Sequence, residues 1–115
     1  MQAAAAAVAI SGPLTVDDPH CAAAHGRRIL AIHGADDQNV PIAGGLGSKG
    51  VSRVDFKSEE SSRRSFESAG ATYRLQVVPD ADHFLNYLEA VLRKSEGVTI
   101  AQKAAAFFGI AAPGR

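Results

Sequence analysis

The stretch RILAIHG, residues 28–34, is the part of the sequence that decides the fold. Its residues 29–33 form a short apolar run that ends at Gly34, and such a run is typical of a strand buried on both faces, as in a parallel sheet. Residues 73–78 predict a second strand, because β-branched and aromatic side chains alternate there with polar ones up to Pro79. We expect these two strands to be parallel neighbours.

Helical patterns surround the two strands. Ser58 can cap a helix that runs to about Ala69 and stops at Gly70. Its interior is polar apart from Phe66, so we expect a surface helix on one face of the sheet. Apolar side chains recur at helical spacing from Phe84 to Leu92. Residues 99–102 predict a capping box for a last helix, residues 100–108. Strands that alternate with helices indicate an α/β fold with a layer of parallel strands and flanking helices.

Two segments leave more room for interpretation. Residues 1–10, MQAAAAAVAI, fit either an Ala-rich helix end or a buried strand of small residues. Residues 35–57 are polar and rich in glycine, and a loop of this length is usually functional or mobile.

Composition narrows the class of protein. The 115 residues predict a single domain, 1–115, with one modest core. Twelve basic and twelve acidic side chains cancel, so no net charge favours nucleic acid or anionic lipid as a partner. No apolar run approaches the roughly 18 residues that a membrane-spanning helix needs. The single cysteine, Cys21, cannot form a disulfide within the chain.

Acid–base side chains follow both predicted strands. Asp36 and Asp37 come shortly after the first strand, and His83 comes shortly after the second. Ligands of open parallel sheets bind at the carboxyl ends of the strands, so an aspartate and His83 can meet at this edge. A carboxylate there would orient the imidazole and stabilise its protonated form, which is two thirds of a nucleophile–base–acid relay.

Residues 29–41, ILAIHGADDQNVP, resemble the strand and turn that carry the catalytic acid of the α/β-hydrolase family. Aligned on His-Gly-x-x-Asp and the Val-Pro that follows, the resemblance places the acid on Asp37. Residues 73–84 resemble the last strand and histidine loop of the family, with the catalytic histidine on His83. The glycine-rich stretch after Pro41 looks most like the polyhydroxybutyrate depolymerase and feruloyl esterase branch. Dienelactone-hydrolase-like and peptidase-like branches share the two main motifs.

The nucleophile motif of that family is missing. Gly-x-Ser-x-Gly lies upstream of the acid in the family, and the nearest stretch here, residues 46–50, begins with Leu46 and follows the acid. The resemblance therefore implies an incomplete α/β-hydrolase-type fold, the C-terminal part of a serine carboxylic-ester hydrolase without its nucleophile-bearing half. We expect little or no esterase activity from the chain alone, with Ser11 and Ser48 as alternative nucleophiles. The alternative is a non-catalytic α/β module that binds a partner.

Other motifs are weaker. Residues 45–50 match Gly-x-Gly-x-x-Gly but neither follow a strand nor open a helix, as a dinucleotide site requires. His20, Cys21 and His25 lack a fourth ligand for zinc. We therefore predict no cofactor and no metal.

The partners that we expect are an ester substrate, if the chain is active, and a second polypeptide. The apolar strand at residues 29–33 needs cover on both faces and both edges, and an uncovered apolar strand edge pairs readily with another chain. We predict self-association or a complementary fragment. The alternative is that residues 1–10 fold back as a helix and leave a stable monomer.

Overall fold

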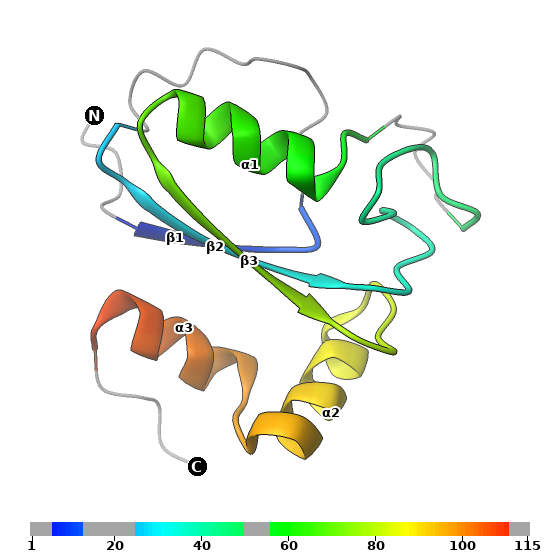
Figure 1. The fold of residues 1–115 in the computed structure, drawn as a ribbon. Helices are drawn as coiled ribbons and strands as arrows, with labels where there is room; N and C mark the ends of the chain where they lie inside the picture. The colour runs from blue at the N-terminus through cyan, green and yellow to red at the C-terminus, as the bar shows by residue number, and fades with distance from the viewer. Residues whose placement is uncertain (1–5, 13–24, 50–55, 111–115) are drawn as a thin grey trace.

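The computed structural model describes residues 6–12, 25–49 and 56–110 of the chain. Within them, β1 (Ala6–Ile10), β2 (Arg28–Gly34) and β3 (Thr72–Val78) form one sheet in the order β1-β2-β3 (Figure 1). Both strand pairs are parallel, with Ile32 opposite Ile10 on one side and Gln76 on the other. The predicted parallel pairing of the two strands is confirmed, and β2 lies in the centre because it is apolar toward both faces.

β1 settles the question left open at the N-terminus for the residues that are described. Ala6–Ile10 is a strand that pairs with β2 along its whole length, so the strand interpretation is correct here and the folded-back helix is not. The expected burial is wrong, because none of these five residues is fully buried and Ala7 is exposed. Residues 1–5 lie outside the described part of the chain.

The helices begin and end close to where the sequence predicts. α1 (Glu59–Ser68) is capped by Ser58, whose hydroxyl accepts from the Ser61 N–H at 3.0 Å. α2 (Leu85–Glu96) follows β3, and α3 (Ile100–Phe108) starts with the predicted capping box. Gly109 ends α3 in the left-handed conformation, which glycine adopts at little cost.

The helices cover opposite faces of the sheet. α1 lies on one face, whereas α2 and α3 lie on the other (Figure 1). The apolar core fills the space between the sheet and α2, and its buried members are Leu30, Ile32, Val78, Ala81, Leu88 and Leu92. The described residues thus form a small α/β layer with its apolar core on one side.

Buried polar side chains lie between α1 and the other face of the sheet, and this corrects the expectation of a surface helix that is polar apart from Phe66. Phe66 does stack on Tyr73, with ring centroids 5.6 Å apart. Glu59 and Ser62 of the same helix are also buried, each with 1% of its surface exposed. α1 therefore packs on the sheet through Phe66 and also through charged and hydroxyl groups, which need partners when they leave water.

None of the described helices combines the length and the apolar character that crossing a membrane would require.

Candidate functional site

The loops that follow β2 and β3 touch each other at the carboxyl edge of the sheet. The backbone N–H of Ala35 donates to Val78 O, and that of Asp36 donates to Ala81 O, both at 2.9 Å. This contact requires glycine at the end of β2, because a Cβ at Gly34 would collide with Ala81 O and lie 2.7 Å from Asp82 O. The two loops are held close enough for their side chains to interact.

Asp37 and His83 meet at this edge. The His83 Nδ1 lies 2.9 Å from the Asp37 Oδ2. The Asp37 side chain is fully buried, and 27% of the His83 side chain is exposed. Asp36, the neighbouring carboxylate, is exposed and takes no part in the pair. The structure thus brings together the two residues that the sequence singled out.

Backbone groups fix the other oxygen of Asp37. Its Oδ1 accepts from the N–H groups of Asn39, at 2.9 Å, and Val40, at 2.7 Å. This is the turn in which an aspartate side chain bonds to the backbone two residues further on. Since Oδ1 is engaged in this way, Oδ2 is the oxygen that faces His83.

Asp82 joins the two loops a second time. Its Oδ1 accepts from the backbone N–H of Gln38 at 2.9 Å and of His83 at 2.7 Å. The pKa of Asp82 lies below its ordinary value, and the largest cause is the hydrogen bond from the backbone N–H of Gln38. Asp82 therefore fixes the backbone at His83 relative to the turn that carries Asp37.

The geometry selects one tautomer of His83. A carboxylate can only accept, so the Nδ1 that faces Asp37 carries the proton and Nε2 keeps its lone pair in the neutral ring. Within the described residues, no group forms a hydrogen bond with Nε2. An imidazole with a buried carboxylate behind it and a free nitrogen in front can accept a proton from a reacting group.

The two alternative nucleophiles have different surroundings. Ser11 follows β1 and is 8% exposed, and its φ of 55° lies in the left-handed region. Its hydroxyl donates to the backbone oxygen of His83 at 3.1 Å. Ser48 is exposed in the glycine-rich loop. Neither hydroxyl forms a hydrogen bond with the His83 ring.

A second, fully buried cluster lies behind Asp37. The His33 Nδ1 is 2.6 Å from the Glu59 Oε2, and the Tyr73 hydroxyl donates to the Glu59 Oε1 at 2.6 Å. The His33 Nε2 is 2.7 Å from Val40 O and 3.4 Å from the Asp37 Oδ2. Sequence reasoning missed this cluster, although a histidine inside an apolar strand is a signal that a buried polar partner is needed.

Burial would by itself lower the pKa of His33. The hydrogen bonds to Glu59 and Val40, and the charges of Glu59 and Asp37, outweigh burial and raise the pKa above its ordinary value. For Tyr73, burial and the Glu59 carboxylate both raise the pKa, so the phenol stays protonated.

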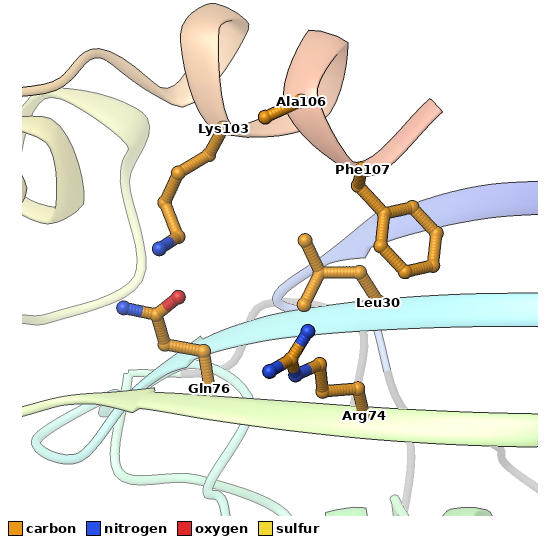
Figure 2. Close-up of a pocket in the computed structure, with 6 residues that line it drawn as sticks. All are labelled: Leu30, Arg74, Gln76, Lys103, Ala106 and Phe107. Atoms are coloured by element: carbon orange, nitrogen blue, oxygen red, sulfur yellow. The ribbon is translucent and has the colours of Figure 1, made fainter. Parts of the chain in front are cut away.

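A cavity of about 320 Å³ lies elsewhere, between the sheet and α3. Its lining residues are Leu30, Arg74, Gln76, Lys103, Ala106 and Phe107 (Figure 2). The polar ends of Gln76 and Lys103 both bind Glu96. None of the lining residues belongs to the Asp37–His83 site, so this cavity does not serve that site.

Residues of both weaker motifs lie outside the part of the chain that the structure describes. His20, Cys21 and Gly50 lie beyond the described residues, and His25 is exposed. Among the described residues, no group of three or more histidine, cysteine, aspartate and glutamate side chains is arranged to hold a metal ion.

Comparison with protein-family models, with curated proteins and with solved structures finds no match to this chain.

Proposed function

We propose that Asp37 and His83 are the acid and base of a hydrolase relay, and that the chain is part of a serine carboxylic-ester hydrolase. The observation that supports this most directly is the 2.9 Å contact between the His83 Nδ1 and the buried Asp37 Oδ2, with Nε2 left unbonded in the described structure. The resemblance of residues 29–41 and 73–84 to α/β-hydrolases supports the same assignment.

The proposed chemistry transfers a proton through His83. Nε2 removes the proton from a hydroxyl nucleophile while the nucleophile's oxygen forms a bond to the ester carbonyl carbon. The ester C–O bond then breaks, and the proton passes from Nε2 to the leaving alkoxide. Asp37 holds the ring in the required tautomer and stabilises the imidazolium that forms in between.

The nucleophile is the part that we propose is supplied from elsewhere. The Ser11 hydroxyl forms a hydrogen bond with His83, but it donates to the backbone oxygen and not to the imidazole ring. We therefore expect the chain alone to turn over little or no ester, and an in-frame Gly-x-Ser-x-Gly upstream of Met1 in the genomic DNA would identify the missing group.

An added alcohol can replace the missing nucleophile and so test the relay. Purified chain is incubated with p-nitrophenyl butyrate and ethanol, and ethyl butyrate is measured by gas chromatography. General-base catalysis contributes at least a hundredfold in complete sites, so we expect about tenfold over buffer here, where substrate binding is weak. His83→Ala and Asp37→Asn should return the rate to that of buffer, whereas Asp36→Asn, the exposed neighbour, should not.

An ethanol-dependent rate that survives His83→Ala in folded protein would refute the assignment. Turnover without ethanol would instead show that water or a hydroxyl of the chain is the nucleophile. Loss of that turnover in Ser11→Ala or Ser48→Ala would identify the hydroxyl, and its survival in both variants would indicate water.

A specific observation also favours the alternative, a non-catalytic module that binds a partner. Phe84, Leu85 and Tyr87, directly after His83, are 57%, 56% and 50% exposed. Apolar side chains gathered in this way are a common feature of interaction surfaces. A chain that associates with a partner and shows no His83-dependent reaction would support this function over the relay.

A further inference from the structure

Both ring nitrogens of His33 face hydrogen-bond acceptors. Nε2 lies 2.7 Å from Val40 O, which is a carbonyl and can only accept, so Nε2 carries a proton. Nδ1 lies 2.6 Å from the Glu59 Oε2. The other Glu59 oxygen already accepts from the Tyr73 hydroxyl, as expected for an ionised carboxylate. This arrangement fits a doubly protonated His33 paired with an ionised Glu59.

The charged state of the pair depends on partners inside the protein, because burial by itself disfavours both charges. His33 is 0% exposed and Glu59 is 1% exposed, so neither charge is screened by water and each depends on the other. The titratable groups around the pair are Tyr73 from β3 and Asp37 from the loop after β2. The Asp37 carboxylate favours the cation as well, since the His33 Nε2 is 3.4 Å from its Oδ2.

His33 links this pair to the candidate site. The Asp37 Oδ2 that approaches His33 is the same oxygen that accepts from His83. Val40 adds a second link, because its N–H donates to the Asp37 Oδ1 while its oxygen accepts from His33. His33 therefore acts on Asp37 both by charge and by fixing the backbone of the turn that holds Asp37.

We propose that Glu59 is a positioning residue of the Asp37–His83 pair: by keeping the buried His33 imidazole doubly protonated, it makes His33 a fixed cationic anchor for the Asp37 carboxylate. Glu59 lies in the first turn of α1. The role in hydrolysis rests on the proposed function, but the anchoring itself does not depend on any turnover.

The test is ¹⁵N NMR of the histidine rings in the full chain, comparing wild type, Glu59→Gln and Glu60→Gln. Glu60→Gln is the matched control, because both variants remove one negative charge from the first turn of α1. Glu60 is exposed and pairs with Arg63. Wild type and Glu60→Gln should show both His33 nitrogens protonated at pH 7, and a His83 Nδ1 proton that exchanges slowly with water. In Glu59→Gln, the His33 Nδ1 should lose its proton, and exchange at the His83 Nδ1 should accelerate about tenfold, equivalent to about 1.4 kcal/mol of lost protection.

Amide exchange at β2 shows whether each variant keeps its fold. A neutral His33 in wild type would overturn the proposal, and so would unchanged exchange at His83 in a folded Glu59→Gln chain. If Glu59→Gln does not fold, Tyr73→Phe provides the second variant, because it removes one hydrogen bond to Glu59 and should accelerate His83 exchange to a smaller extent. No acceleration in folded Tyr73→Phe would then overturn the proposal. The two proposals can fail separately. If Glu59→Gln changes the His33 and His83 signals as expected but no His83-dependent ethyl butyrate forms, the hydrolase assignment is wrong and the anchoring by His33 is right.

Discussion

Asp82 binds Gln38 with both oxygens of its carboxylate. The backbone N–H of Gln38 donates to Oδ1 at 2.9 Å, and its side-chain amide donates to Oδ2 at 2.8 Å. Gln38 is next to Asp37 and Asp82 is next to His83, so this contact joins the two loops immediately beside the acid–base pair. It therefore fixes the two loops relative to each other at the residues next to the pair.

Replacing Asp82 by Asn should loosen the site and weaken the fold at neutral pH. The hydrogen bonds from Gln38 lower the pKa of Asp82, so its contribution is present above the ordinary pKa and is lost as the pH falls through the lowered value. Asp82→Asn removes this contribution at every pH. Urea unfolding followed by circular dichroism at pH 3 to 7 measures the free energy of unfolding. The variant should be less stable than wild type at neutral pH, and this deficit should shrink toward pH 3. Asp80→Asn is the control, since Asp80 is exposed and has no described partner; an equal deficit there would contradict the prediction.

Gly34→Ala should separate the two loops. The new Cβ would collide with Ala81 O and come within 2.7 Å of Asp82 O, and both atoms belong to the backbone. Overpacking of this kind costs about 3 kcal/mol of the free energy of unfolding, and the His83 Nδ1 proton should exchange faster. Gly12→Ala offers a comparison, because a Cβ there meets only Ile10 O at 3.7 Å. Urea denaturation measures the free energy of unfolding of the two variants. Equal stability would show that the two loops can shift to make room for the new Cβ.

Local patterns in the sequence were enough to predict much of the fold. The apolar run in β2, the alternation in β3 and the Thr99–Gln102 capping box depend on residues close together in the chain, and all three are present. An aspartate after β2 could be paired with His83 in advance because each follows a strand, and parallel strands end at one edge. The choice of Asp37 over Asp36 needed the alignment on His-Gly-x-x-Asp.

The buried cluster could not be predicted in the same way. A glutamate in the first turn of a polar helix, such as Glu59, is usually exposed, and its negative charge interacts favourably with the helix dipole. Its burial depends on His33, 26 positions earlier, and on Tyr73, 14 positions later. Only the packing of α1 on the sheet brings these three side chains together, and no local periodicity encodes that contact.

The buried His33–Glu59 pair should give stability a distinctive dependence on pH. Hydrogen bonds to Glu59 and Val40 overcome burial and raise the pKa of His33 above 6.5. The stabilisation is therefore complete below about pH 6.5 and is lost as the pH rises through the folded-state value. Glu59→Gln should lower the free energy of unfolding by about 2 kcal/mol at pH 6, and the difference from wild type should narrow toward pH 9. Urea denaturation from pH 6 to pH 9 measures the free energy of unfolding of both chains. A difference between them that widens with pH would show that His33 is neutral.

The chain should self-associate through the edge of β1. Among the described residues β1 has a strand on one side only, so its outer backbone groups can pair with another strand. Two identical edges related by a two-fold axis pair antiparallel and form a closed dimer. Light scattering coupled to size exclusion should therefore show a dimer or larger species. Ala7 is the exposed residue of β1, so Ala7→Lys should shift the chain toward monomer by placing a charge on the edge, while Ala7→Thr should not.

A different surface would respond to a different substitution. Leu85 is 56% exposed at the start of α2, and Leu85→Lys should leave an edge-to-edge dimer intact because it is not part of β1. Dissociation by Leu85→Lys but not by Ala7→Lys would move the interface to α2 and favour the interaction-module function. A monodisperse wild-type monomer with strongly protected amides at residues 29–33 would show that β1 and β2 are stable without a partner, because an edge that needed cover would leave those amides exposed to exchange.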